Sequence, residues 1–547
     1  VDTILAARGE VASLQIVVKA NEEIGEMNAT VKEINKEDGT TLHSEAEAGW
    51  VGYVRVGRSY SPPSRDIIRS ASDYFPDPIL IDSAFSVEPG EVQPLWISVP
   101  IGQSAEPGLY KGTVVITGKT VSDKKEWAKD FYIRVYPVTL GKSPLYVTNW
   151  SAHFNTTALS YMNNNEPLEL YSEFYWELVE MHAQMMASHR QNMHRIYPVW
   201  HTQYMYDAGK YTFDFTRFDK EAELFDRYGV LERIEGGHLA WRSGNWDSPF
   251  FVEVPLPDSE ESRALQAGIN PLKVENGMRF VKLPIEDPRT QNFLDQFLPA
   301  LKEHLSEKGW LNRYMQHIAD EPTAMNSDSY RAISGYVKKH LPDVKIVDAV
   351  LTSKELAGTI DVWVPLLDVL HRDYAFYQDL QKQAKELWFY TCVVPRGNYA
   401  NRFIDLPLIQ KIKWLTSPVC NPPIRGYPSD CAFHSVLVPV PCVLPRKAGK
   451  YKRNFYGNLT PCGILYFHVV HTLSSISLFL FWMVDEIEGN GGERQPECPD
   501  MPLLSKGVQK NAGRQVCDLP FDISRSYQPT GTFKEEDFAF CSYIYTK

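Results

Sequence analysis

The feature that most constrains the fold is an alternation between residues 145 and 392, where short apolar segments typical of strands are followed by longer segments with the spacing of apolar residues typical of helices. An alternation of strands and helices predicts a parallel sheet covered by helices. Seven strands spread over about 250 residues favour a (β/α)8 TIM-like barrel over an open sheet. The predicted strands are Leu145–Asn149, Met193–Pro198, Arg233–Leu239, Tyr314–Asp320, Lys345–Val350, Ile360–Pro365 and Leu387–Cys392.

The segments between these strands carry helix signals. Apolar side chains recur between residues 288 and 308 at the spacing of one helical face. Asp287 comes directly before Pro288, which is the order expected of an N-cap and the first helical residue. Residues 169–187 have the same period, so we expect a second helix there.

The first part of the chain has a different pattern. In residues 1–140, short apolar runs alternate with turn signals such as Pro62-Pro63, Pro89-Gly90 and Pro107-Gly108. Regularly spaced short strands with Pro and Gly turns are typical of a β-sandwich. We therefore expect a multidomain protein, with a β-sandwich over 1–140 followed by a barrel over 145–415.

The barrel pattern stops before it is complete. An eighth strand should follow a helix that begins near Leu406, but the helical period is lost after Leu415. Residues 416–547 form an atypical tail rich in Pro and Cys, with seven of the eight cysteines. We therefore expect a barrel that is incomplete at its C-terminal end.

Three interpretations of this tail stay open. A mistranslated or disordered segment would arise from an out-of-frame exon or a retained intron. A genuine Cys-rich appendage is the second interpretation. The third is a membrane anchor at residues 463–484, a run long enough to cross a bilayer with only His468 and His471 as titratable groups.

Composition limits the classes of partner. The net charge of −12 argues against binding to nucleic acid, which requires a basic face. The 13 Trp and 29 Tyr suit either a sugar-binding site or a large aromatic core. The chain begins at Val1 without a signal peptide, so we expect its natural N-terminus to be missing. Sequons such as Asn28-Ala-Thr permit a secreted or lysosomal-type secretory route.

The sharpest chemical feature is the pair Asp320-Glu321, followed by Pro322, at the end of the fourth predicted strand. Adjacent residues on a strand point to opposite faces, so both carboxyl groups reach one site only where the strand ends. Glycosidases normally place two carboxyl groups on different strands, whereas neighbouring carboxyl groups suit the variant in which the sugar's own 2-acetamido group attacks. Glu321 would then be the general acid and base, and Asp320 would orient the acetamido group. Helix capping is the alternative role for such a pair.

Other polar and aromatic side chains follow the predicted strands at the end where barrel enzymes carry their sites. We expect these to bind substrate: Trp150, His194, His238, Trp241, His317, Trp363, Trp388, Tyr390, Asn401 and Arg402. The histidines at 182, 189, 194 and 201 have no carboxylate or Cys at ligand spacing, so we expect no metal site.

These residues include motifs of a known family. The stretch from about Trp150 to Asp405 resembles the catalytic domain of glycoside hydrolase family 123, and residues 1–140 resemble the β-sandwich that precedes it. The resemblance rests on Trp150, Met186–Asn192, His317–Pro322, Asp361–Pro365, Trp388–Cys392 and Asn401–Asp405. It implies exo-β-N-acetylgalactosaminidase activity by the substrate-assisted route, with the family's Asp-Glu pair at Asp320 and Glu321. Relatives continue with a last helix and an eighth strand, from which this chain departs after Leu415.

The sequence therefore predicts a retaining exo-glycosidase that removes terminal β-linked N-acetylgalactosamine from a glycan or glycoconjugate, without a metal or organic cofactor. A truncated barrel would put this activity in doubt, because missing strands expose sheet edges and core. One alternative is a non-catalytic carbohydrate-binding or interaction protein with a degenerate barrel. Another is a conventional two-carboxylate glycosidase, with Asp405 as the second group.

Overall fold

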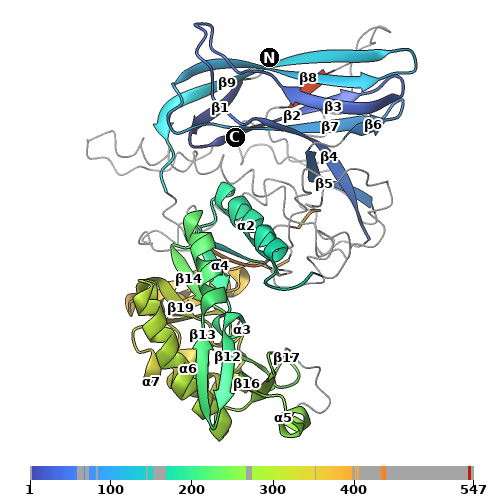
Figure 1. The fold of residues 1–547 in the computed structure, drawn as a ribbon. Helices are drawn as coiled ribbons and strands as arrows, with labels where there is room; N and C mark the ends of the chain where they lie inside the picture. The colour runs from blue at the N-terminus through green and yellow to red at the C-terminus, as the bar shows by residue number, and fades with distance from the viewer. Residues whose placement is uncertain are drawn as a thin grey trace, which may run out of the picture. The chain divides into compact units, whose positions relative to one another are not determined.

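The computed structural model describes residues 3–57, 67, 73–81, 84–142, 146–151, 168–265, 274–351, 353–392, 394–396, 399, 401 and 403–405, and two strands at 433–438 and 540–543. The chain divides into two compact units (Figure 1), one of residues 1–50, 81–140 and 475–547 and the other of residues 51–80 and 141–474. Arg402 and the candidate anchor 463–484 lie outside the described residues. Among the residues that are described, no helix is both long and apolar enough to cross a membrane.

The first unit is built from two sheets with the orders β1-β9-β8-β3-β6 and β24-β2-β7-β4-β5; the end of β4 and nearly all of β5 belong to the second unit. Alternate residues of β2 and β9, such as Leu14, Ile16 and Ile133, lie in one shared core, as expected for a β-sandwich. The strands are β1 (Thr3–Arg8), β2 (Val11–Lys19), β3 (Ile24–Val31), β4 (Glu47–Val56), β5 (Asp73–Ile81), β6 (Phe85–Val87), β7 (Val92–Pro100), β8 (Gly108–Lys119), β9 (Lys124–Thr139) and β24 (Phe540–Tyr543).

The second unit contains a parallel sheet with the order β11-β14-β19-β20-β21-β22. Asn192, just before β11, bonds to Val147 of β10 through its backbone and side chain, which sets β10 beside β11. Each of the seven predicted strands therefore has a counterpart in the structure. The counterparts are β10 (Val147–Ser151), β11 (Met193–Ile196), β14 (Arg233–Gly236), β19 (Tyr314–Gln316), β20 (Lys345–Val350), β21 (Val362–Pro365) and β22 (Glu386–Leu387).

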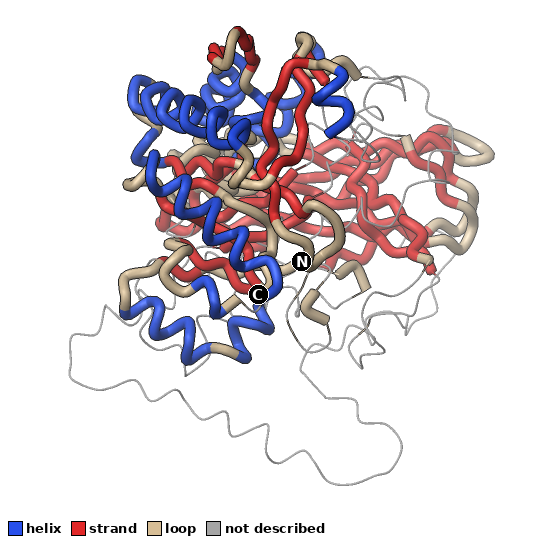
Figure 2. The backbone as a smooth tube through the Cα atoms, turned by 90° about the horizontal axis from the view of Figure 1, so that it is seen from below, coloured by secondary structure: helices blue, strands red, loops and turns tan. Residues whose placement is uncertain are grey.

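Helices connect these strands, and Figure 2 draws them in blue beside the red strands. The predicted N-cap is confirmed, because Asp287 accepts a hydrogen bond from the backbone N–H of Arg289 at the start of α6. The helix predicted at 169–187 is α2. The helices are α2 (Glu173–Ser188), α3 (Pro198–His201), α4 (Thr216–Arg227), α5 (Glu260–Leu265), α6 (Pro288–Glu307), α7 (Ser327–His340), α8 (Leu367–Arg372) and α9 (Tyr374–Lys382).

Two antiparallel insertions interrupt the alternation of strands and helices, and neither was predicted. A hairpin pairs β12 with β13, and a four-stranded sheet has the order β15-β16-β18-β17. These strands lie in the long connections before α4 and α6, where the repeated pattern places no element. Their bounds are β12 (Gln203–Asp207), β13 (Lys210–Asp214), β15 (Ala240–Arg242), β16 (Phe250–Pro257), β17 (Val274–Glu275) and β18 (Met278–Leu283).

The tail contributes a strand to each unit. β23 (Phe433–Val438) pairs in parallel with β10, and β24 pairs antiparallel with β2. The loss of periodicity after Leu415 therefore does not mean that the tail lacks strands. β10 therefore has β23 as a neighbour as well as β11.

Candidate active site

The pair Asp320-Glu321 lies in the loop that follows β19, and both side chains are half-buried. β19 ends at Gln316, four residues before the predicted end at Asp320, so both carboxyl groups are beyond the regular strand. Glu321 adopts a φ of 42°, in the left-handed region that non-glycine residues rarely occupy. Such backbone conformations concentrate at functional sites, where the surrounding structure holds them in place.

Both carboxyl groups have raised proton affinity. Burial, reinforced by the neighbouring charge of Asp320, raises the pKa of Glu321 to about 7. Burial also raises the pKa of Asp320, against the opposing effect of Arg242 and Arg195. Tyr390 donates its hydroxyl hydrogen to Oε1 of Glu321. A carboxyl group with a pKa near 7 can act as an acid and then as a base at neutral pH.

We expect the shifted pKa of Glu321 to be visible in stability. The folded pKa lies above the ordinary value of 4.5, so the folded protein loses stability as the pH rises between the two values. Gln at position 321 cannot ionise, so the variant Glu321→Gln avoids this loss. The melting temperature of the variant minus that of the wild type should therefore be larger at pH 8 than at pH 5. Differential scanning fluorimetry measures this difference. Glu307→Gln, at an exposed position at the end of α6, is the matched control. If the difference in melting temperature between Glu321→Gln and the wild type is the same at pH 5 and pH 8, the raised pKa of Glu321 is contradicted.

Two guanidinium groups flank the pair. Arg242 donates a hydrogen bond of 2.8 Å from Nη2 to the backbone oxygen of Glu321. Arg195 lies 3.8 Å from the centre of the Trp150 ring, and both arginines interact electrostatically with Asp320. They favour a carboxylate at Asp320 and so oppose the effect of burial on that group.

A buried network of charges lies on the adjoining strands. His317 has Nδ1 at 2.8 Å from Oδ1 of Asp348 and Nε2 at 3.1 Å from Oε2 of Glu235, and all three side chains are fully buried. Burial disfavours the imidazolium, but the hydrogen bonds to the two carboxylates outweigh it and raise the pKa of His317 to about 9. Glu235 also accepts a hydrogen bond of 3.0 Å from Nε1 of Trp150. A cation held between two anions thus links β14, the residue directly after β19, and β20.

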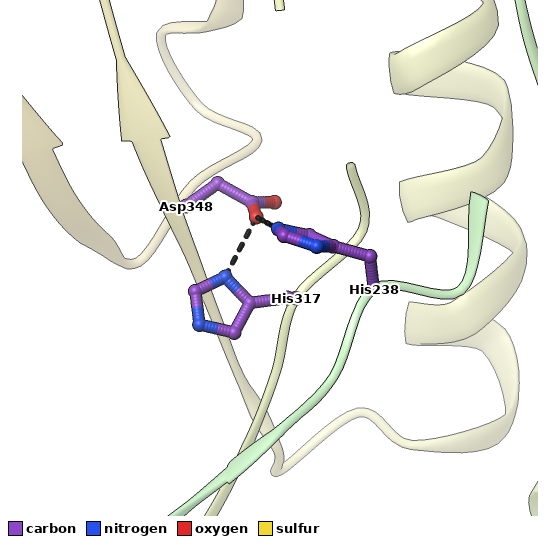
Figure 3. A group of neighbouring side chains, drawn as sticks. All are labelled: His238, His317 and Asp348. Atoms are coloured by element: carbon purple, nitrogen blue, oxygen red, sulfur yellow. Dashed lines mark hydrogen bonds and ion pairs between the residues drawn. The ribbon is translucent and has the colours of Figure 1, made fainter. Parts of the chain in front are cut away.

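The same region contains a trio whose donor atoms could hold a metal ion. The described part of the chain has one such group, with ligand atoms within 4.8 Å of one another; it consists of His238, His317 and Asp348. Figure 3 shows both rings directed at Asp348. Because each nitrogen of His317 faces a carboxylate oxygen at hydrogen-bond distance, both nitrogens need a proton, whereas a ligand needs a lone pair. We therefore interpret the trio as part of the charged network.

Aromatic rings collect beside this network. Tyr197 stacks on Trp200 and Trp241 at centroid distances of 5.3 and 6.4 Å, and His238 contacts Trp150 and Trp241 edge to face at 5.5 and 5.9 Å. Tyr197 fits against the backbone because residue 237 is glycine, where a Cβ atom would lie 2.2 Å from the ring. The charge of Asp320 contributes to the raised pKa of Tyr197, after the larger effect of burial. Tyr197 therefore lies within electrostatic range of Asp320.

The structure thus brings together seven of the residues predicted to bind substrate or catalyse. His317, His238, Trp150 and Trp241 contact one another around the network, and Tyr390 contacts Glu321. Asp320 interacts electrostatically with His317.

Four predicted substrate-binding residues do not face the pair, and three of them pack in the interior. His194 stacks on Phe225 and bonds to Glu221, both of α4, because it alternates with Arg195 along β11. Trp363 packs edge to face against Phe376 and Tyr377. Trp388 stacks on Tyr146 and lies 5.7 Å from Arg233, at the beginning of the parallel strands.

The fourth such residue is Asn401, which holds its own loop. Its side chain donates hydrogen bonds to the backbone oxygens of Cys392 and Pro395. Asp405, the alternative second carboxylate, is buried.

Sequence reasoning missed three charged residues of the site: Glu235, Arg242 and Asp348. A signal for two of them existed, because a charged residue within a short apolar strand, such as Asp348 in Lys345–Val350, must have a partner when buried. Arg242 had no such signal, since its role depends on the inserted β15.

Comparison with known proteins agrees with the resemblance. The family description "Glycoside hydrolase 123, catalytic domain" matches residues 155–427, beyond Leu415, and "Glycoside hydrolase 123 N-terminal domain" matches residues 3–118. No curated protein matches the chain.

Among solved structures, a family 123 glycoside hydrolase from Clostridium perfringens is 14% identical, with a TM-score of 0.59, and the match covers 89% of this chain and 84% of that one. A GH20 exo-β-N-acetylglucosaminidase from Vibrio harveyi is 9% identical over 80% of this chain and 90% of that one, but its TM-score of 0.27 is too low to carry an argument. The two family matches and the shared fold lead to one conclusion: the chain belongs to glycoside hydrolase family 123, with an N-terminal domain and a catalytic domain.

Proposed function

We propose that this protein is a retaining exo-glycosidase that releases terminal β-linked N-acetylgalactosamine by substrate-assisted catalysis. The observation that carries the proposal is the half-buried pair Asp320-Glu321, in which the pKa of Glu321 is raised to about 7. A group that must first give and then take a proton needs such a pKa. Membership of family 123 supports glycoside hydrolysis as the reaction.

In the first step, protonated Glu321 gives its proton to the glycosidic oxygen. The acetamido carbonyl oxygen of the substrate attacks the anomeric carbon, the bond to the leaving group breaks, and an oxazolinium ion forms. Asp320 accepts a hydrogen bond from the acetamido N–H and stabilises the positive charge. The nearby guanidinium groups of Arg195 and Arg242 favour the ionised form of Asp320 that this role requires.

In the second step, Glu321 acts as a base. It removes a proton from a water molecule, whose oxygen attacks the anomeric carbon and reopens the oxazolinium ring. Two inversions leave the configuration unchanged, and the acetamido group is restored. Tyr390, which donates a hydrogen bond to Glu321, orients the carboxyl group in both steps.

For the substrate we propose the glycan of a glycolipid. Support comes from the family 123 structure of Clostridium perfringens, whose description concerns glycolipid glycan hydrolysis. We also propose that the parallel strands from β10 to β22 are seven strands of a (β/α)8-type barrel over about residues 145–415, preceded by a sandwich over 1–140. The parallel pairing of β23 with β10 supports closure by a strand of the tail, beyond residue 415.

We expect the enzyme to require the 2-acetamido group. A 4-nitrophenyl β-galactoside has a hydroxyl group at that position, so it should be cleaved at least about a thousandfold more slowly than the matching N-acetylgalactosaminide, because it lacks the intramolecular nucleophile. Release of nitrophenol measures both rates, and a thiazoline analogue of the oxazoline should inhibit cleavage.

Two results would contradict this scheme. Comparable rates on the two substrates would favour a conventional two-carboxylate mechanism. Binding of the sugar without cleavage of either substrate would favour a carbohydrate-binding protein.

A further inference from the structure

We propose that Trp246 is the platform for the leaving group, where it binds the sugar to which the released N-acetylgalactosamine is attached. This inference rests on the proposed function and adds a subsite to it. Its basis is the connection between β15 and β16, residues 243–249, which is bound directly to the segment that follows Glu321.

Hydrogen bonds of Thr323, Asn326 and Arg242 join this connection and the end of β15 to the segment after β19. Thr323 donates from Oγ1 to Oδ1 of Asp247 at 3.0 Å, and Asn326 donates from Nδ2 to the backbone oxygen of Trp246 at 3.2 Å. Arg242, at the end of β15, donates to the backbone oxygen of Glu321 at 2.8 Å. The position of Trp246 is therefore set relative to the general acid.

The indole itself is held by the same arginine. The guanidinium carbon of Arg242 lies 3.7 Å from the centre of the Trp246 ring, and its Nε donates to the backbone oxygen of Trp246 at 2.7 Å. One face of the ring is thus covered, while 48% of the residue remains exposed. A ring fixed by its backbone and by a stacked cation can bind a ligand with little loss of side-chain entropy.

The location of this ring decides which part of the substrate it meets. A general acid protonates the oxygen between the two sugars, so the leaving sugar lies on the side of Glu321. Tyr197, which interacts electrostatically with Asp320, and Trp150, which stacks with the Arg195 that also interacts with Asp320, are buried and belong to the side of the released sugar. A single exposed Trp is ordinary on a protein surface, but this one is joined through Arg242 to the backbone of the proton donor.

The test compares two leaving groups in the full-length protein. Trp246→Ala should lower kcat/KM about tenfold for a disaccharide of β-N-acetylgalactosamine on galactose, which is the loss expected for one aromatic contact. For the trifluoroethyl β-N-acetylgalactosaminide, whose leaving group is too small to reach the ring, the change should stay within about twofold, since only the contact is lost. Inhibition by the thiazoline, which fills only the site of the released sugar, should be unchanged. Trp246→Phe should recover most of the activity on the disaccharide.

The matched control is Met325→Ala, since Met325 is an exposed apolar residue on the segment after Glu321. This variant should change kcat/KM for the two substrates by the same factor. An equal loss on both substrates would mean that Trp246 only holds the loop, and it would overturn the subsite. Unchanged cleavage of the disaccharide would overturn it as well. If the wild type cleaves no β-N-acetylgalactosaminide and does not bind the thiazoline, the proposed function fails and the subsite with it.

Discussion

Replacing Glu321 by Gln should lower kcat/KM for 4-nitrophenyl β-N-acetylgalactosaminide by about 10³-fold, which is within the range for loss of a general acid. Gln keeps the size of the side chain and its hydrogen bonding to Tyr390 but cannot transfer a proton. Steady-state rates measure the loss. Binding of the thiazoline should persist, because that ligand needs no proton from the enzyme.

The same carboxyl group should set the alkaline limb of the pH profile. Because the first step needs protonated Glu321, kcat/KM of the wild type should fall tenfold per pH unit above its pKa of about 7. Residual activity of Glu321→Gln should lack this limb. The control Glu307→Gln should keep the wild-type dependence of kcat/KM on pH in the same assay. Full activity of Glu321→Gln would remove Glu321 from the mechanism.

Replacing His317 by Gln should reduce the free energy of unfolding by about 3–5 kcal/mol, the range measured when one partner of a buried ion pair is removed. Glu235 and Asp348 would lose the cation between them while both remain fully buried. Urea unfolding followed by Trp fluorescence measures the change. His340→Gln is the control, because His340 bonds to a half-exposed Asp295 at 2.8 Å, and such surface pairs contribute at most about 1 kcal/mol.

The pH dependence gives this prediction a sign. The folded pKa of His317, about 9, lies above the ordinary 6.5, so its stabilising charge is fully present below pH 6.5 and is lost as the pH rises through 9. The free energy of unfolding that is lost in His317→Gln should therefore be larger at pH 6 than at pH 10. An equal deficit at both values would mean that His317 is neutral and acts only through packing.

Local patterns were sufficient to predict the elements that carry the site. Each of the seven strands was found from its apolar run, and α6 from its period and from the Asp287 cap. These signals depend on residues close together in the chain, which any single sequence displays. The pair Asp320-Glu321 could be located for the same reason, since a strand end and a following Pro are local features.

Orientation was not predictable in the same way. His194 and Arg195 are neighbours on β11, yet one contacts α4 and the other lies over Trp150, and only the placement of α4 decides which side is interior. Trp363 and Trp388 were expected at the rim, but the packing of α9 and Tyr146 takes them into the core. Large aromatic side chains suit both environments, so their type alone does not separate them.

The sequence by itself thus determined the alternation of strands and helices in the second unit, the location of the pair Asp320-Glu321 and the family, because each depends on residues that are close together in the chain. Only the tertiary structure decided how Glu235, His317 and Asp348 meet from three strands. It also decided that an inserted loop joins Trp246 to Glu321 through Arg242. The energy of such contacts depends on distances between residues far apart in the chain, and those distances exist only after the chain has folded.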